Sequence, residues 1–225
     1  MKKLTGTVVI AGSDGDIGRA LVRLFAANGV KPVGLSRKAR HKTGLSASLR
    51  LDLSDPKAVE AAAKKLTARG KTVRCVINAA GYFRKTDDAS WDKDVLRHNL
   101  GVADNLLKTF TPRLAGVEGA RIVTIGSVDC KYPNVNSYSY TVAKAAVKAL
   151  VGAYRKRHRD GRVNFDLVAP GAIAGRMRAH KAEDKAALLQ PEDVARVCWL
   201  LCSLGSHAAF EDIVIYPKTL AYSVP

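Results

Sequence analysis

Three residues between positions 127 and 144 have types and a spacing that suit proton transfer. Tyr140 and Lys144 are four residues apart, about one helical turn, so both lie on the same face of a helix. A free tyrosine has a pKa of about 10, and lowering it towards 7 requires about 4 kcal/mol of preferential stabilisation of the phenolate. A neighbouring ammonium in a partly dry cleft contributes charge of the required sign. Ser127 follows an apolar run, residues 121–126, and would hold the oxygen atom that gains or loses charge.

Segments typical of strands and helices alternate along the chain and would position these residues. Short apolar runs predict strands at residues 7–11, 31–36, 49–53, 73–78, 121–126, 163–168 and 212–216. Helical periodicity and end signals predict helices at residues 17–27, 56–69, 91–114 and 191–203, and one from about Tyr140 to about His158. This alternation predicts an α/β fold, a doubly wound parallel sheet with helices on both faces. No linker, repeat or low-complexity segment divides the chain, so we predict a single domain, residues 1–225.

The chain is strongly basic, with a formal net charge of +17 over 225 residues. Such a charge is compatible with nucleic-acid binding. However, the basic residues are spread along the sequence, and their two clusters, residues 36–42 and 155–159, lack the interleaved aromatic residues of a single-strand binder. We therefore expect no nucleic-acid partner, and attribute the charge to a solvated surface and a polyanionic cofactor or substrate.

The cysteines and the apolar runs indicate the compartment. Cys75, Cys130, Cys198 and Cys202 form no CxxC pair, and no histidine stands at metal-ligand spacing from them, so we predict reduced thiols and no metal site. The longest apolar runs are far shorter than the roughly 20 residues of a membrane helix. The apolar run near the N-terminus is too short for a signal peptide and leads into a glycine-rich loop. We expect a cytoplasmic protein with no membrane partner.

The first predicted strand is followed by a glycine-rich turn, AGSDGDIG, that opens the first helix. Gly12, Gly15 and Gly18 give a GxxGxxG pattern. In a strand–turn–helix context such a loop brings backbone N–H groups and the positive end of the helix to a pyrophosphate. The pattern predicts a dinucleotide site.

The motifs occur in an order that resembles the short-chain dehydrogenase/reductase family. The residues that carry the resemblance are Gly12, Gly15, Gly18, Asp52, the turn Asn78-Ala79-Ala80-Gly81, Asn99, Ser127, Tyr140, Lys144 and Pro170-Gly171. Each motif is common alone, but the combination is specific and spans nearly the whole chain. The resemblance implies a Rossmann-type sheet of about seven strands and a homodimer or homotetramer.

The resemblance also implies roles for individual residues. The catalytic set would be Asn99, Ser127, Tyr140 and Lys144, with Asn99 stabilising a kink in its helix and anchoring a water that relays protons to Lys144. Asp52 would contact the adenine. Residues expected to contact the cofactor are Gly12, Ser13, Asp14, Gly15, Asp16, Ile17, Gly18, Ser36, Arg37, Asp52, Leu53, Asn78, Ala79, Ala80, Gly81, Tyr140, Lys144, Pro170, Gly171 and Ile173. Candidate walls of the substrate pocket are Tyr82, Val128, Asp129 and Tyr132.

Two positions depart from the family pattern. Asp16 stands where the commoner glycine-rich loop has its middle glycine. Two acids, Asp14 and Asp16, beside a pyrophosphate are unfavourable unless they cap the helix or face away, and Arg19 would offset them. Gly175 stands where family members often have a threonine that holds the carboxamide of the nicotinamide.

The second predicted strand ends in Ser36-Arg37-Lys38, without the acid that binds the ribose diol of NAD. Because arginine pairs strongly with phosphate, this ending favours NADP(H) over NAD(H). The predicted function is reversible carbonyl–alcohol conversion on a small molecule. The basic residues Arg176, Arg178, His180 and Lys181 fit either an anionic or phosphorylated substrate or a solvated helix. Two alternatives stay open: a nucleotide-sugar epimerase or dehydratase with a retained cofactor, and a non-catalytic dinucleotide-sensing or nucleic-acid-binding protein.

Overall fold

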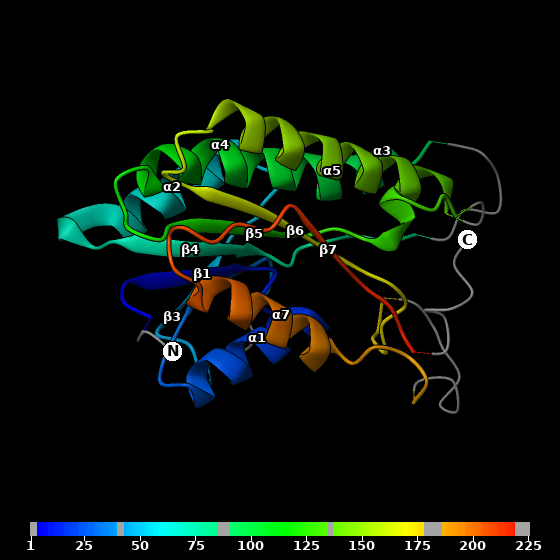
Figure 1. Ribbon diagram of the computed structural model, residues 1–225, viewed down its shortest axis with the longest axis horizontal. Coiled ribbons are helices and arrows are strands. Elements are labelled where there is room, and N and C mark those ends of the chain that lie inside the picture. The colour runs from blue at the N-terminus through cyan, green and yellow to red at the C-terminus, as the bar shows by residue number, and fades with distance from the viewer. Residues whose placement is uncertain (1–3, 40–42, 85–90, 135–136, 178–185, 219–225) are drawn as a thin grey trace.

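The computed structural model describes residues 4–39, 43–84, 91–134, 137–177 and 186–218. Its centre is a sheet of seven parallel strands in the order β3-β2-β1-β4-β5-β6-β7 (Figure 1). The strands are β1 (Thr7–Ala11), β2 (Val33–Ser36), β3 (Ala47–Arg50), β4 (Val73–Asn78), β5 (Arg121–Ile125), β6 (Asn164–Pro170) and β7 (Asp212–Ile215). The chain runs outward from β1 to β3 and then returns to place β4 on the other side of β1. Such a reversal of strand order is where open α/β sheets form a crevice at their carboxyl ends.

Helices cover both faces of the sheet, as the alternation predicts (Figure 1). They are α1 (Asp16–Ala27), α2 (Pro56–Thr67), α3 (Lys93–Leu96), α4 (Val102–Leu114), α5 (Tyr138–Arg157) and α7 (Pro191–Ser203). Successive residues of β1 show the division, because side chains alternate across a strand. Val8 and Ile10 pack with α1 and α7, whereas Val9 and Ala11 pack with α2, α4 and α5.

Helix ends follow signals in the sequence. The Asp55 carboxylate caps α2 by accepting the N–H of Lys57, and Pro56 takes the first helical position, where its missing N–H costs nothing. Gln190 and Asp193 form a reciprocal capping box at the start of α7, with Pro191 in its first turn. Within the described residues, no helix combines the length and apolarity needed to cross a membrane.

Most predicted bounds that differ from the structure differ by one or two residues, and three of the differences bear on the site. The second strand begins at Val33 because the preceding Pro32 has no N–H for the ladder. The third strand is shifted towards the N-terminus, to Ala47–Arg50, and the Asp52 side chain instead forms a turn by accepting the N–H and hydroxyl of Ser54. The long helix predicted at residues 91–114 begins at Lys93, and it contains a π-helical turn, η2 (Arg97–Gly101), between α3 and α4.

Candidate active site

A cavity of about 600 Å³ lies at the carboxyl ends of the central strands. Its walls come from the glycine-rich loop, the residues that follow β2, β4, β5 and β6, and the first half of α5. The predicted site residues on its lining are Gly12, Asp14, Gly15, Asp16, Ile17, Ser36, Arg37, Asp52, Leu53, Ala79, Ala80, Gly81, Tyr82, Ser127, Val128, Asp129, Tyr140, Lys144, Pro170, Gly171 and Ile173. The structure therefore brings most of the predicted residues to one cavity.

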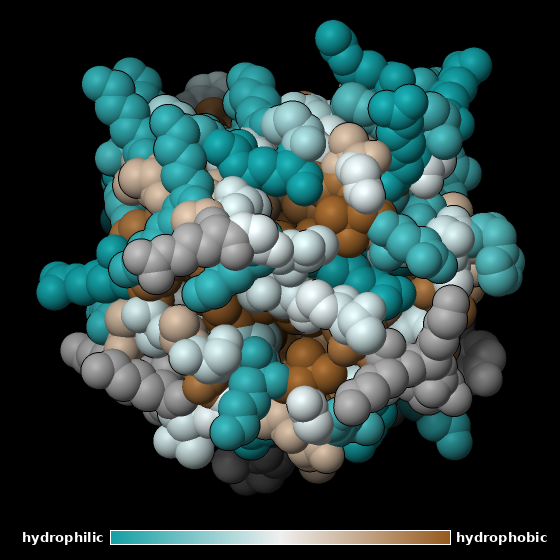
Figure 2. All heavy atoms as spheres, turned by 90° about the vertical axis from the view of Figure 1, so that its left-hand side faces the viewer, coloured by the Kyte–Doolittle hydropathy of each residue, from teal (hydrophilic) through white to brown (hydrophobic). Residues whose placement is uncertain are grey.

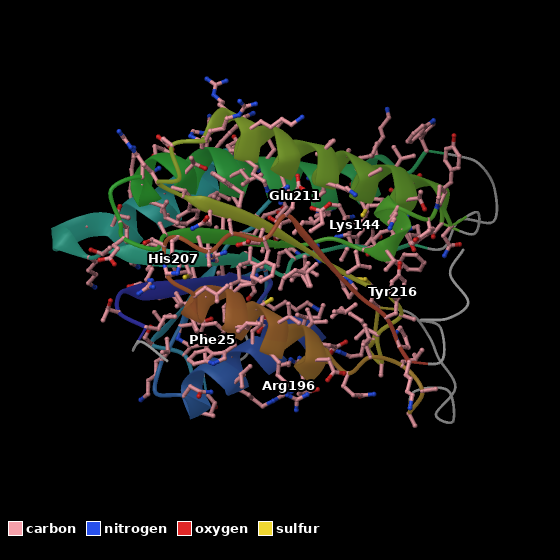
Figure 3. All side chains as sticks on the ribbon, viewed as in Figure 1. Phe25, Lys144, Arg196, His207, Glu211 and Tyr216 are labelled. Atoms are coloured by element: carbon pink, nitrogen blue, oxygen red, sulfur yellow. The ribbon has the colours of Figure 1, made fainter. Side chains whose placement is uncertain are left out.

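Ser127, Tyr140 and Lys144 all line this cavity. Ser127 follows β5 and caps a short 3-10 helix, η3 (Val128–Cys130), where its hydroxyl accepts the N–H of Asp129 at 3.2 Å. Lys144 points from α5 towards the sheet, and its Nζ donates to the Ile125 carbonyl at 3.1 Å (Figure 3). The same Nζ is 5.5 Å from the centre of the Tyr140 ring. One helical turn has therefore placed an ammonium beside a phenol, as the spacing predicts.

Lys144 is only 4% exposed, although it carries an ionisable group. Burial lowers the pKa of Lys144 to about 8, because the charged form loses its hydration, while the nearby Cys130 and Asp129 act in the opposite direction. Near neutral pH the ammonium still dominates. A cation in this dry position interacts strongly with a developing phenolate.

Asn99 lies in the π-helical turn, outside the cavity lining. Its side-chain amide donates to the Tyr82 carbonyl at 2.7 Å and to the Val95 carbonyl at 2.8 Å. A π turn interrupts the regular helical hydrogen bonds, and the amide supplies a donor to the Val95 carbonyl. Asn99 thus connects the irregular helix to the segment after β4 that forms a cavity wall. Its proposed water relay stays a prediction.

The glycine-rich loop is too tightly packed for side chains at two of its glycines. Gly12 has φ +81°, and a Cβ there would lie 2.6 Å from the Ala80 amide nitrogen. A Cβ on Gly18 would collide with the Gly12 carbonyl oxygen. Ser13 is fully buried below the loop, and Gly34 of β2 makes room for its hydroxyl. The surface offered to the cavity by this turn is therefore mainly backbone, at the start of α1.

Both acids of the loop have partners. The Asp14 carboxylate accepts the Ser36 hydroxyl at 2.9 Å. The Asp16 carboxylate accepts the N–H of Arg176 at 2.6 Å and its Nε at 2.7 Å. Arg19, which was expected to offset these charges, lines the same cavity, and its Nε donates to the Asp14 backbone carbonyl at 3.0 Å. Arg176, one of the basic residues that fit either an anionic substrate or a solvated helix, lines the cavity and pairs with Asp16 of the glycine-rich loop, while Arg178, His180 and Lys181 lie outside the described residues.

The end of the cavity near β2 is basic. Arg37 and Lys38 line it, and Arg50 at the end of β3 donates from its Nε to the Arg37 carbonyl at 3.2 Å. Partial burial of Asp52 opposes its ionisation, but the hydrogen bonds from Ser54 and the charges of His98 and Arg97 together hold the pKa of that carboxyl below its usual value. Asp52 and Leu53 form the adjoining wall.

Five predicted residues do not line the cavity: Ser13, Gly18, Asn78, Asn99 and Tyr132. Asn78 supports the wall, since its side-chain oxygen accepts the Ala80 N–H, while the Tyr132 ring lies against Tyr216, 6.5 Å between centres. Ala172 also lines the cavity, within the segment Pro170 to Ile173 that was expected to border the nicotinamide, whereas the lining residues that no sequence motif indicated are His98, Val102, Ile125, Gly126 and Met177. His98 lies in the π turn, and Val102 directly follows it.

A dinucleotide fits this set of residues. The basic end of β2 and the Ser127 end of β5 are separated by three strand spacings, about 14 Å across the sheet. Between them lie the backbone surface of the glycine-rich loop and the N-terminus of α1, which favour a pyrophosphate.

Comparison with known proteins gives a consistent result. The family model described as short chain dehydrogenase matches residues 6–186. The chain is 26% identical to the 3-oxoacyl-(acyl-carrier-protein) reductase FabG of Escherichia coli (strain K12) over 191 residues, 80% of this chain and 78% of that protein. It is 27% identical to a sulfoacetaldehyde reductase of Chromohalobacter salexigens, covering 98% and 97% of the two chains. A solved structure, the closed form of serine dehydrogenase complexed with NADP+, matches with a TM-score of 0.84 at 20% identity, covering 97% of this chain and 98% of that one.

Proposed function

Because the chain belongs to the short-chain dehydrogenase/reductase family, we propose that it is an NADP(H)-dependent oxidoreductase that interconverts a carbonyl and a secondary alcohol on a small molecule. The observation that carries this proposal is that Ser127, Tyr140 and Lys144 line the same cavity as the glycine-rich loop. Carbonyl–alcohol chemistry itself agrees with the reductases and dehydrogenases among its relatives.

In this mechanism the side chains of the protein stabilise the charge that develops on the carbonyl oxygen of the substrate. A bound nicotinamide would supply or accept hydride at the substrate carbon. During reduction Tyr140 gives its proton to the carbonyl oxygen, and the Ser127 hydroxyl donates a hydrogen bond to the same atom. The Lys144 ammonium stabilises the resulting phenolate and would hold the ribose of the nicotinamide. Asn99 keeps the cavity wall in place through its bond to the Tyr82 carbonyl.

Substitution of the phenol tests the catalytic assignment. Tyr140→Phe keeps the ring and removes the proton, so we expect kcat for NADPH-linked reduction to fall by about 100-fold or more across a panel of carbonyl compounds. Tyr138→Phe is the matched control, since Tyr138 is two residues earlier on α5 and is exposed. Near-normal turnover by Tyr140→Phe would exclude the mechanism.

We propose NADP(H) over NAD(H) because Arg37 and Lys38 line the end of the cavity beside β2. Guanidinium and ammonium groups there favour a 2′-phosphate. The similar serine dehydrogenase structure is itself a complex with NADP+. The test is kcat/KM with both cofactors, and equal or better use of NADH would refute this preference.

Assembly and location complete the proposal. We propose one domain, residues 1–225, acting as a homodimer or homotetramer in the cytoplasm. The four cysteines are free thiols, which supports a reducing compartment. Light scattering of the purified protein measures the assembly, and a monomer at micromolar concentration would contradict it.

A further inference from the structure

The two positions that depart from the family pattern lie against each other. Asp16 replaces a glycine of the loop before α1, and Gly175 replaces a threonine in the segment after β6. A Cβ on Gly175 would lie 2.9 Å from Asp16 Oδ2, so the absence of a side chain at 175 makes room for the carboxylate. The next residue, Arg176, then donates both its backbone N–H and its Nε to that carboxylate. The two departures from the family pattern, Asp16 and Gly175, therefore form one structural feature.

Arg176 also reaches the neighbouring acidic residue of the loop. One terminal nitrogen of its guanidinium donates to the Asp14 backbone carbonyl at 3.2 Å. Three hydrogen bonds thus connect the segment after β6 to the glycine-rich loop, and Asp16, Gly175 and Arg176 all line the cavity. The contact lies beside the backbone surface that suits a pyrophosphate.

We propose that Arg176 is the counter-ion that allows a glycine-rich loop carrying Asp16 to accept the pyrophosphate of the cofactor. This inference rests on the proposed function, because it concerns the same dinucleotide. A carboxylate at the start of α1 competes with an anionic ligand for the positive end of the helix and repels it. Pairing with Arg176 neutralises the charge of the Asp16 carboxylate. It also holds the segment after β6 beside the cavity. Arg176 is thus a positioning residue for cofactor binding.

A purely structural role does not account for the pair. The side chains of Arg176 and Asp16 are 63% and 26% exposed, and ion pairs this open to water contribute little to folding stability. A direct role in binding an anionic substrate is also disfavoured, because the guanidinium is directed at the glycine-rich loop, which precedes α1, rather than at Ser127.

A double-mutant cycle separates these roles. Arg176→Gln leaves the Asp16 charge uncompensated, so the Kd for NADPH, measured by nucleotide fluorescence, should rise about tenfold or more at low salt. Asp16→Asn alone should leave the Kd unchanged or lower it. The Kd of the double variant Asp16→Asn/Arg176→Gln for NADPH should return to within about threefold of the wild-type value. The weakening in Arg176→Gln should also shrink as salt screens the unpaired carboxylate.

Arg196→Gln is the matched control. Arg196 makes a similarly exposed ion pair with Asp193 on α7, away from the cavity lining (Figure 3). The Arg196→Gln substitution should change neither the Kd for NADPH nor the Tm of the protein. If Arg176→Gln binds NADPH like the wild type, or if the double variant stays as weak as Arg176→Gln, the counter-ion role is wrong. The second result would show that Arg176 binds the phosphate directly.

The same cycle with inorganic pyrophosphate distinguishes this inference from the proposed function. Calorimetry reports the anion site without the nicotinamide or the carbonyl substrate. Pyrophosphate binding that follows the cycle, in a protein with no NADPH-linked turnover, would retain the counter-ion role and refute the oxidoreductase. Normal NADPH-linked turnover, with pyrophosphate binding that does not change across the cycle, would retain the oxidoreductase and refute the counter-ion role. A wild type that binds neither pyrophosphate nor a dinucleotide would overturn both.

Discussion

The burial of Lys144 sets the pH range in which carbonyl reduction should work. Its pKa is lowered to about 8, so the ammonium is the main form at pH 7 and is lost as the pH rises through 8 and 9. Without the cation, the phenolate left on Tyr140 after proton transfer loses its stabilisation. We therefore expect kcat/KM for reduction to be level below pH 7 and to fall about tenfold per pH unit well above pH 8.

Two variants identify the group responsible. Lys144→Arg keeps a cation with a pKa of about 12 or higher, so the decline in kcat/KM should move to higher pH. Lys148→Met, one turn further along α5, removes a partly exposed lysine that pairs with Asp212, and it should leave the profile unchanged. A decline that stays at the same pH in Lys144→Arg would assign the titration to another group.

Asp14 opposes the proposed preference for NADP(H). Its carboxylate is bound to the Ser36 hydroxyl at the end of β2, next to the basic residues that suit a 2′-phosphate. A negative charge there repels the dianionic phosphate more than it affects the neutral ribose diol of NAD. Asp14→Asn should therefore raise the ratio of kcat/KM for NADPH to that for NADH, by about tenfold. A lower ratio would mean that the carboxylate does not face the phosphate.

At the scale of secondary-structure elements, the π-helical turn should depend on Asn99. Asn99→Leu keeps similar volume but leaves the buried Val95 carbonyl and the Tyr82 carbonyl without their donor. Each unsatisfied group costs about 1–3 kcal/mol, so urea unfolding should show a loss of about 2–4 kcal/mol. Asn105→Leu on α4 removes a single hydrogen bond, to the Leu53 carbonyl, and should cost less. If Asn99→Leu and Asn105→Leu lost the same free energy of unfolding, a special role of Asn99 in the π turn would be contradicted.

Most elements could be predicted from the sequence because their signals are local. The buried run of β1, the Asp55 cap of α2 and the one-turn spacing of Tyr140 and Lys144 each lie within a few residues. The kink at Asn99 was expected only from the family resemblance, because the local residue pattern does not indicate a π turn that is held partly by a bond to Tyr82, 17 residues away. The pairing of Asp16 with Arg176 spans 160 positions and depends on where β1 and β6 end in the sheet.

At the scale of the whole molecule, much of the positive charge lies far from the cavity. The last turns of α2 and α5 carry Lys64 and Lys65, and Arg155, Lys156 and Arg157. Crossover helices run antiparallel to the strands, so these turns lie at the amino ends of the sheet. Figure 2 shows this face, which is the left-hand side of Figure 1, with hydrophilic side chains projecting along its top and sides and less polar residues between them. A strand such as β4 spans about 20 Å, which separates this charge from the cavity.

This distance predicts how the net charge of +17 affects cofactor association. The Debye length is about 8 Å at 0.15 M salt and about 30 Å at 0.01 M, so distant charges attract NADPH only at low salt. In stopped-flow fluorescence, Lys64→Gln/Lys65→Gln should lower the association rate constant at 0.01 M and leave it unchanged at 0.15 M. Arg37→Gln, on the cavity lining, should lower it at both, by on the order of threefold. If the α2 variant slowed association at 0.15 M as well, those lysines would have to contact the cofactor, and the placement of its site at the carboxyl ends of the strands would be wrong.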